Sequence, residues 1–238
     1  HILAHFPALP IAAEYIHRDA FDVAEVYGKD MFLAVQYLGT HRLPALFAFK
    51  NWLDRTASRL PFLPRFLSDR LLQAMARLFP AHLPERVKQF RNRFAHHLIL
   101  KMGEDGTADA RAFLKKLFPS SAGDAFECTD DEARKAFLHR FAVAGAAVRY
   151  RAINAREVED IVALDIALRR NDREWFEQLP DSLRKPIISS LYYGHFFCHV
   201  FHQDYIVAKG HDPAALEEDM WTLLDARGAE YPAEHNVG

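Results

Sequence analysis

The sequence has little cysteine and no long apolar run. Its 238 residues include two cysteines, Cys128 and Cys198, which belong to no Cys-x-x-Cys or Cys/His pattern. This argues against a disulfide framework and a structural zinc site, and it favours a reducing compartment. No apolar run reaches the roughly 18 residues that a membrane-spanning helix needs. Residues 1–10 lack the basic start and apolar middle of a signal peptide, so any membrane contact is expected to be peripheral.

An initiator methionine is also missing, and the closing AEHNVG has the composition of a loop. We therefore expect the chain to be a piece of a longer protein. Half of the residues are hydrophobic, so the chain is long enough and apolar enough to bury a sizeable core.

Charge is distributed unevenly along the chain. The formal net charge is −2, yet residues 41–102 carry twelve basic and three acidic residues. The remainder carries 18 basic and 29 acidic residues. A split of this size suggests that the basic part meets an anionic partner.

Prolines divide the basic segment, residues 41–94, into short amphipathic pieces in which aromatic and leucine side chains alternate with cations. This pattern suits a helical attachment to an anionic membrane surface. The candidate membrane-binding residues are Lys50, Trp52, Arg55, Arg59, Arg70, Arg77, Arg86, Lys88, Arg91 and Arg93. Packing on a partner protein, or a solvated outer layer of the core, would give the same spacing. Nucleic acid is disfavoured, because large apolar residues outnumber Ser, Asn, Gln and Gly.

Elsewhere, the patterns predict an α+β fold, an antiparallel sheet flanked by helices. Residues 12–38 have a helical stripe with a break at Gly28, and Thr129 with Glu132 forms a capping box before a helix that ends at about Ala144. Asp212 and Pro213 begin a last helix that Gly228 ends. The further expected helix covers residues 107–118, and the expected strands cover residues 97–102, 125–128, 148–153, 162–170 and 192–207.

Three histidines lie in the stretch GHFFCHVFHQDY, at positions 195, 199 and 202. On a helix they would share one face and resemble a metal site. The surrounding Tyr, Phe, Val and Ile residues instead predict one strand. In a regular strand His195 and His199 face one way and His202 the other, so the residues alone predict no cluster.

Several longer stretches closely resemble the bacterial quinone-dependent D-lactate dehydrogenases, which are respiratory FAD flavoproteins peripheral to the inner membrane. These stretches are VEDIVALDIALRRND, LYYGHFFCHVFHQDYIV, RGAEYPAEHNVG, KAFLHRFAVAGAAVRYRA and EYIHRDAFDVAEVYGKDMFL. The resemblance implies a flavoenzyme cap domain in residues 1–40 and 95–238, interrupted by a basic membrane-binding insertion in residues 41–94. It also implies that the FAD-binding domain precedes residue 1, that the substrate is D-lactate, that electrons pass to membrane quinone, and that the protein lies on the cytoplasmic face of the inner membrane.

The wider group of FAD-linked 2-hydroxyacid dehydrogenases suggests site residues. Its motifs His-x-Gly-Asp-Gly-Asn-x-His and Glu-His-Gly-Ile-Gly resemble the segments His195 to His202 and Glu234 to Gly238. By this resemblance His195, His202 and Glu234 would hold a divalent metal, and His235 would be the catalytic base with Glu234 beside it. The glycine-rich centre of the first motif is replaced here, which predicts the loss of the turn that would join the two histidines.

The mechanism implied by this resemblance needs a base for the hydroxyl proton and a cation for the substrate carboxylate. His235 is the expected base, and Arg169 and Arg170 are the expected carboxylate ligands. Two other readings stay open. The chain could belong to a related metal-dependent 2-hydroxyacid dehydrogenase with another substrate, or it could be a non-catalytic docking module.

Overall fold

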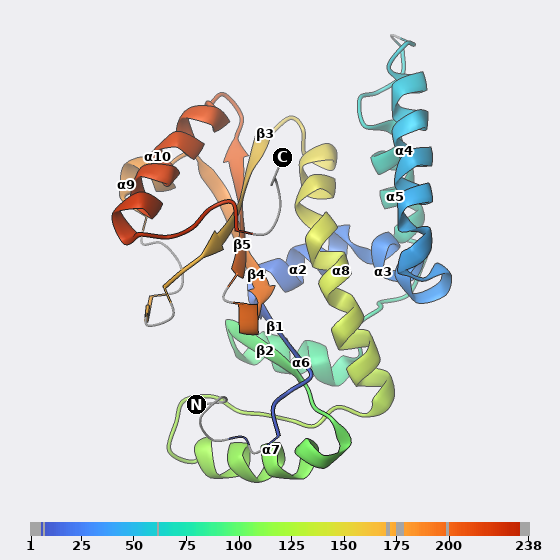
Figure 1. Cartoon of the computed structure of the whole chain (residues 1–238). Coiled ribbons are helices and arrows are strands. Elements are labelled where there is room, and N and C mark those ends of the chain that lie inside the picture. Colours follow the sequence, from blue (N-terminus) through green and yellow to red (C-terminus); the bar gives the residue numbers. More distant parts are fainter. Residues whose placement is uncertain are drawn as a thin grey trace.

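The computed structural model describes residues 6, 8–60, 62–169, 172–174, 179–198 and 200–233. Its elements, shown in Figure 1, are β1 (Ala12–His17), α2 (Arg18–Tyr27), α3 (Lys29–Leu38), the 3₁₀ turn η1 (Thr40–Arg42), α4 (Leu43–Ala57), α5 (Leu67–Ala76), α6 (Glu85–Arg93), β2 (His96–Lys101), α7 (Glu104–Leu117), α8 (Asp130–Ile153), β3 (Val158–Ala167), α9 (Asp181–Arg184), β4 (Ile187–His195), the 3₁₀ turn η2 (Phe196–Cys198), β5 (Val200–Ala208) and α10 (Pro213–Arg227).

The strands form one antiparallel sheet in the order β2-β1-β4-β5-β3, which confirms the predicted α+β class. Helices cover both faces of this sheet rather than one (Figure 1). On one face, α2 and α8 enclose a core that includes Ile16, Leu191 and Ile206. On the other, α10 packs its Met220 and Leu224 against Tyr205 and the alternate side chains of β3. The side-chain alternation of each strand thus supplies both cores.

Helix α8 is longer than predicted. The Thr129–Glu132 capping box is confirmed at its start, but the helix continues through Gly145 to Ile153. Residues 148–153 are therefore helical, and the predicted strand there is wrong. The reason is packing: the small residues of α8 let α2 and α3 approach closely, and a Cβ on Gly28 would lie 2.8 Å from the Cβ of Ala142. Tertiary contact thus outweighs the break that glycine suggested.

Three further predictions need correction. Residues 12–17 form strand β1, because their backbone pairs with β2 and β4 and most of their side chains are buried. The helical stripe begins only at Arg18. Residues 125–128 contain no strand. The single strand predicted over residues 192–207 is two strands, β4 and β5, joined by the turn η2. The helix α10, with Asp212 as its N-cap and Gly228 in the left-handed conformation, is confirmed.

The two helices α4 and α5 form a hairpin that stands beside α8 at the edge of the molecule, away from the sheet (Figure 1). We call residues 43–76 the α4–α5 hairpin. Asp54 on α4 accepts hydrogen bonds from the backbone nitrogen and hydroxyl of Ser68 at 3.0 and 2.6 Å, which ties the two helices together. Helix α6 instead lies against the body of the protein, with Val87 in the same core as Ile16.

Candidate functional site

The turn η2 brings His195 and His202 together. His195 ends β4 and His202 lies in β5, where it is the Cα partner of Tyr193. Because positions 193 and 195 share a face, His202 lies on the same face as His195, and the two ring centroids are 5.6 Å apart. The prediction that they face opposite ways is therefore wrong, and so is the predicted loss of the turn. His199 lies outside the described residues.

Gly194 makes this arrangement possible. A Cβ at Gly194 would collide with the carbonyl oxygen of Val200 and lie 3.0 Å from the Cα of Phe201. The backbones of β4 and β5 can thus approach closely only with glycine at this position. The glycine-rich motif centre is absent, yet a glycine directly before His195 allows the same reversal of the chain.

Each of the two histidines is held by a carboxylate from the neighbouring strand. His195 Nδ1 lies 2.9 Å from Glu14 Oε2, and Glu14 is its register partner on β1. His202 Nδ1 bonds Asp165 Oδ1 on β3, again its register partner. Directly opposed residues on antiparallel strands have adjacent side chains, so the register itself produces both pairs. A carboxylate on Nδ1 fixes the tautomer and the orientation of each imidazole ring.

Arg140 of α8 completes the first pair. Its Nη1 donates to Glu14 Oε1 at 2.6 Å, and its guanidinium lies 4.7 Å from the ring centres of both Phe137 and Phe141. Burial raises the pKa of the Glu14 carboxyl, but the hydrogen bonds of His195 and Arg140 outweigh burial and hold that pKa below its usual value. Glu14 is therefore ionised and orients an imidazole and a guanidinium at once.

Tyr193 and Asp204 lie beside the second pair. The Tyr193 hydroxyl donates to Asp204 Oδ2 at 3.1 Å, and the Tyr193 ring is 4.9 Å from that of His202. Burial raises the pKa of Asp204 to about 6, although the hydrogen bond from Tyr193 and the charge of His202 act in the opposite direction. Burial and the nearby Asp204 charge raise the pKa of Tyr193 well above its usual value. We call Glu14, Arg140, Asp165, Tyr193, His195, His202 and Asp204 the sheet-face cluster.

Sequence reasoning missed Glu14, Arg140 and Asp165 as site residues. A signal was present for Asp165, because a lone carboxylate in the apolar run VALDIAL costs free energy unless it is paired. Glu14 is likewise a buried charge inside a strand of buried residues, but residues 12–17 were expected to be helical. Arg140 gave no such signal, since arginine is common on helix surfaces.

Glu234 and His235 lie outside the described residues, but the chain leading to them is placed. The backbone nitrogen of Ala233 donates to the carbonyl oxygen of Asp165 at 2.9 Å, and Ala167 pairs with Glu230. The segment therefore arrives beside β3 at the residue that holds His202. Within the described part of the chain, no group of three His, Cys, Asp or Glu side chains has the geometry of a metal site.

The predicted carboxylate ligands are not in the cluster. Arg169 follows β3, and its guanidinium lies against Gly228 at the end of α10, where a Cβ would lie 3.0 Å from its Nε. Arg170 lies outside the described residues. Of the arginines that the structure describes near His195, Arg140 is the one joined to it through a shared carboxylate.

The candidate membrane-binding residues divide into two groups. In the first, the cation is paired with a carboxylate of the same chain: Lys50 with Asp69 at 2.9 Å, Arg86 with Glu132 at 2.9 Å, Lys88 with Glu85 at 2.7 Å, Arg91 with Asp22 at 3.2 Å and also with Glu25, and Arg93 with Asp124 at 2.8 Å. All but Lys50 belong to α6. Arg86, Arg91 and Arg93 hold α6 onto the body through these pairs, whereas the pairs of Lys50 and Lys88 lie within the basic segment itself.

The second group lies on the α4–α5 hairpin and its flanks and is exposed. Arg55, Arg59, Arg70 and Arg77 have no carboxylate partner among the described residues, and Trp52 is 55 % exposed. Large apolar side chains are exposed around them. These are Leu46, Phe47, Phe49, Leu60, Phe62, Leu71, Met75, Leu78 and Phe79. Phe62 is 77 % and Leu78 85 % exposed, so large apolar side chains are exposed on the same segment as four arginines that no described carboxylate neutralises.

A buried ion network fastens the hairpin to the body. Arg149 of α8 donates from Nε to Asp69 of α5 and from Nη2 to Asp30 of α3, both at 2.8 Å. Lys50 of α4 lies 2.9 Å from the other oxygen of Asp69. Arg149 and Asp69 are both buried. Because buried charges are stable only when paired, this network fixes the root of the hairpin on α8.

The chain is similar to known proteins over its whole length. A family model described as "D-lactate dehydrogenase, membrane binding" matches residues 1–238. Quinone-dependent D-lactate dehydrogenases of Haemophilus influenzae and Escherichia coli are 56 % and 54 % identical over the whole chain, and that of Corynebacterium glutamicum is 43 % identical over 97 % of it. The chain spans only 41–42 % of the length of these relatives. Among the described residues, no helix is both long and apolar enough to cross a bilayer.

Proposed function

The chain belongs to the D-lactate dehydrogenase membrane-binding family, and from this premise we propose that it is the part of a quinone-dependent D-lactate dehydrogenase that handles the substrate proton and attaches the enzyme to the membrane. The relatives that carry this name are more than twice as long. The oxidation of D-lactate to pyruvate therefore also requires the FAD-binding domain, which we expect to precede residue 1.

One observation carries the catalytic part of this proposal: two histidines on one sheet face, each held at Nδ1 by a carboxylate. FAD, when bound, accepts the hydride from the carbinol carbon of the substrate. The hydroxyl proton then needs an acceptor whose pKa lies near working pH, and imidazole meets this need. Each of these imidazole rings is held in a fixed orientation by its carboxylate, which suits either direct proton transfer or the support of His235.

We assign His235 as the base and Glu234 as the group that orients it. Both follow Ala233, which is hydrogen-bonded to β3 at Asp165. Ala233, the residue before Glu234, therefore lies beside the His202–Asp165 pair. This continuity supports a single site formed by the sheet-face cluster and the final segment.

Arg140 is the proposed ligand of the substrate carboxylate. Its Nη1 is bound to Glu14, while its Nε is buried and has no hydrogen-bond partner among the described residues. A guanidinium can grip a carboxylate with two parallel hydrogen bonds, and Phe137 and Phe141 hold this one in place. Arg169 and Arg170 remain alternatives for the same role, although Arg169 lies against Gly228.

A divalent metal is the second candidate for this site, as in a related 2-hydroxyacid dehydrogenase with another substrate. A metal-bound histidine usually donates its other ring nitrogen to a carboxylate, and both His195 and His202 do so. The donor set thus fits a metal held by these histidines and Glu234. Such an ion would acidify the substrate hydroxyl. Metal analysis of the purified full-length protein, with and without His195→Ala, distinguishes the two versions.

The α4–α5 hairpin is the proposed attachment to anionic phospholipid. Trp52, Arg55, Arg59, Arg70 and Arg77, together with the exposed apolar side chains, form an amphipathic surface that can enter the acyl boundary while its cations meet lipid headgroups. Arg86, Arg91 and Arg93 fix α6 to the body instead, and Lys88 is paired within α6. Attachment at this surface would be peripheral, on the cytoplasmic face of the inner membrane, where the enzyme can reach quinone.

The test uses the full-length protein with anionic vesicles that contain quinone. We expect D-lactate to reduce the flavin and then the quinone, with vesicle binding that weakens as salt rises. Faster flavin reduction by a different 2-hydroxy acid would favour the metal-dependent alternative. Vesicle binding that is absent at low salt, with capture of a protein partner instead, would favour the docking module.

A further inference from the structure

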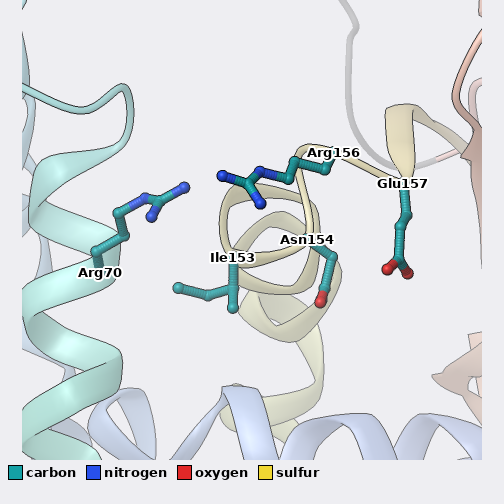
Figure 2. A pocket seen from close by; sticks show the side chains of 5 residues that line it. All are labelled: Arg70, Ile153, Asn154, Arg156 and Glu157. Carbon is teal, nitrogen blue, oxygen red and sulfur yellow. The ribbon is translucent and has the colours of Figure 1, made fainter.

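An open cleft separates α5 of the hairpin from the end of α8. Its volume is about 360 Å³, and it is lined by Arg70, Ile153, Asn154, Arg156 and Glu157. Figure 2 shows the guanidinium groups of Arg70 and Arg156 extending toward each other from opposite sides, with Ile153 below the space between them and Asn154 below Arg156. Two like charges that converge on one space repel each other unless an anion lies between them.

Neither guanidinium is neutralised by the chain. Among the described residues, Arg70 and Arg156 have no carboxylate partner, and both side chains are exposed. The neighbouring Arg151 differs, because it is paired with Asp160 at 3.2 Å and lies over the ring of Phe66. The Glu157 carboxylate borders the cleft but points away from Arg156 in Figure 2. The charged groups that face the centre of the cleft are therefore the two guanidiniums.

Hydrogen bonds of neighbouring residues hold the backbone on both sides of the cleft. Asp69, which directly precedes Arg70, bonds Arg149 of α8 at 2.8 Å. At the other side, Asn154 caps α8 and donates its side-chain amide to the carbonyl oxygen of Tyr150 at 2.9 Å and to the Tyr27 hydroxyl at 3.3 Å. The cleft thus has a preformed frame, which lowers the entropic cost of binding a ligand between the arginines.

We infer that this cleft binds a phosphate ester. Arginine pairs match the oxygens of a phosphate group, and the apolar side chain of Ile153 offers a surface to the carbon atoms of an attached glycerol. The free oxygen of the Asn154 side chain can accept a hydrogen bond from a hydroxyl group. An anionic phospholipid headgroup and a soluble phosphate ester share this chemistry.

The position of the cleft favours a lipid headgroup as the source of the phosphate. This choice of source rests on the proposed membrane attachment, whereas phosphate binding in the cleft does not depend on it. Arg70 belongs to the hairpin, and the next residue, Leu71, is 50 % exposed. An apolar side chain that enters the bilayer beside Arg70 would place this arginine at the level of the lipid phosphates.

The test compares two double variants of the full-length protein that each lose two exposed cations. R70Q/R156Q removes both arginines of the cleft, and R55Q/R77Q removes two arginines outside it. Binding is measured to vesicles of phosphatidylcholine with one-fifth phosphatidylglycerol. The loss of two surface charges alone should weaken binding about thirtyfold. We expect R70Q/R156Q to weaken it at least tenfold more than R55Q/R77Q does.

A second arm omits lipid and titrates each protein with glycerophosphoglycerol and with inorganic phosphate. Saturable binding that R70Q/R156Q abolishes and R55Q/R77Q retains would support the cleft with a soluble ligand, even if no form of the protein binds vesicles. An excess loss on vesicles without soluble binding would assign the ligand to the lipid headgroup. Equal losses in the two variants, together with no saturable soluble binding, would overturn the inference.

Discussion

The sheet-face cluster and the α4–α5 hairpin use charged residues in opposite ways. In the cluster, Glu14 is hydrogen-bonded to both Arg140 and His195, and Asp165 is hydrogen-bonded to His202. On the hairpin and its flank, Arg55, Arg59 and Arg77 have no carboxylate partner among the described residues, and apolar side chains around them are exposed. Charged groups that are paired within the chain orient the neighbouring side chains, whereas charged groups exposed to solvent can bind the surface of a membrane. Whether a charged side chain has a partner within the chain therefore distinguishes the proposed catalytic region from the proposed membrane-binding region better than the number of charged residues does.

The junction between the two regions gives the largest expected effect. Arg149→Leu should destabilise the protein by about 3–5 kcal/mol, because it removes the common partner of the buried Asp69 and the half-buried Asp30 and leaves Lys50 as the cation beside Asp69. Urea unfolding measures the change. Arg151→Leu, two residues further along α8, removes a more exposed pair with Asp160 and should cost about 1 kcal/mol or less. Equal losses in both variants would mean that the buried network does not hold the hairpin.

Within the cluster, Arg140→Gln should lower kcat/KM for D-lactate about a hundredfold, mainly through a higher KM, because the substrate carboxylate loses a charged ligand. Steady-state kinetics of the full-length protein measure this split. Arg134→Gln changes an exposed arginine of the same helix, paired with Asp131, and should leave KM unchanged. Vesicle binding should be the same in both variants, and weakened vesicle binding in Arg140→Gln would break the separation of the two regions.

Within the basic segment, exposed and paired arginines should differ in their effect on vesicle binding. R55Q/R77Q should weaken vesicle binding by about 2 kcal/mol, since each basic residue near the surface contributes roughly 1 kcal/mol. Urea stability should stay unchanged. R91Q/R93Q removes two cations that are paired with carboxylates of the body, so it should lower stability and leave vesicle binding within about threefold of wild type. Equal vesicle losses in the two pairs would show that pairing does not distinguish α6 from the hairpin.

The smallest expected effect is a pH dependence of stability that arises from three buried histidines. Burial lowers the pKa of His82 and of His97 to about 4, and that of the fully buried His139 well below its usual value. These groups stay neutral in the folded state but take up protons when the chain unfolds, so stability falls as pH decreases from about 6.5 toward 4. The raised pKa of Asp204 acts in the opposite direction.

His82→Gln separates these contributions. His82 and His139 are hydrogen-bonded to each other at 2.9 Å, and removing one titrating ring should flatten the decline in stability between pH 7 and pH 5. Urea unfolding at pH 7, 6 and 5 measures the slope. A slope equal to that of the wild type would mean that the buried histidines do not govern the acid sensitivity.

Much of the fold could be predicted from the sequence where local signals and packing agree. The capping box at Thr129 and the Asp212–Gly228 limits of the last helix are local hydrogen-bonding patterns, and both were right. The turn between β4 and β5 was missed because its residues Phe196–Cys198 contain no turn-forming residue. Gly194 was the remaining sign, but its need for space arises only when Val200 lies opposite.

The candidate site was less predictable for the same reason. His195 and His202 were chosen by their spacing, but their carboxylate partners come from β1 and β3, up to 181 residues away in sequence. Such pairs depend on strand order and register, which periodicity does not determine. The division of the basic segment likewise depends on which acidic residues of α2 and α8 lie opposite α6.

The most direct test of the account is the single-turnover rate of flavin reduction by D-lactate in the full-length protein with His202→Gln, with His211→Gln as an exposed control. His202 is held by Asp165 beside His195, and we expect its loss to slow flavin reduction at least a hundredfold while FAD stays bound and vesicle binding is unchanged. The His211 variant should reduce its flavin at the wild-type rate. A near-normal rate in His202→Gln would contradict the assignment of the sheet-face cluster as the site of the chemistry.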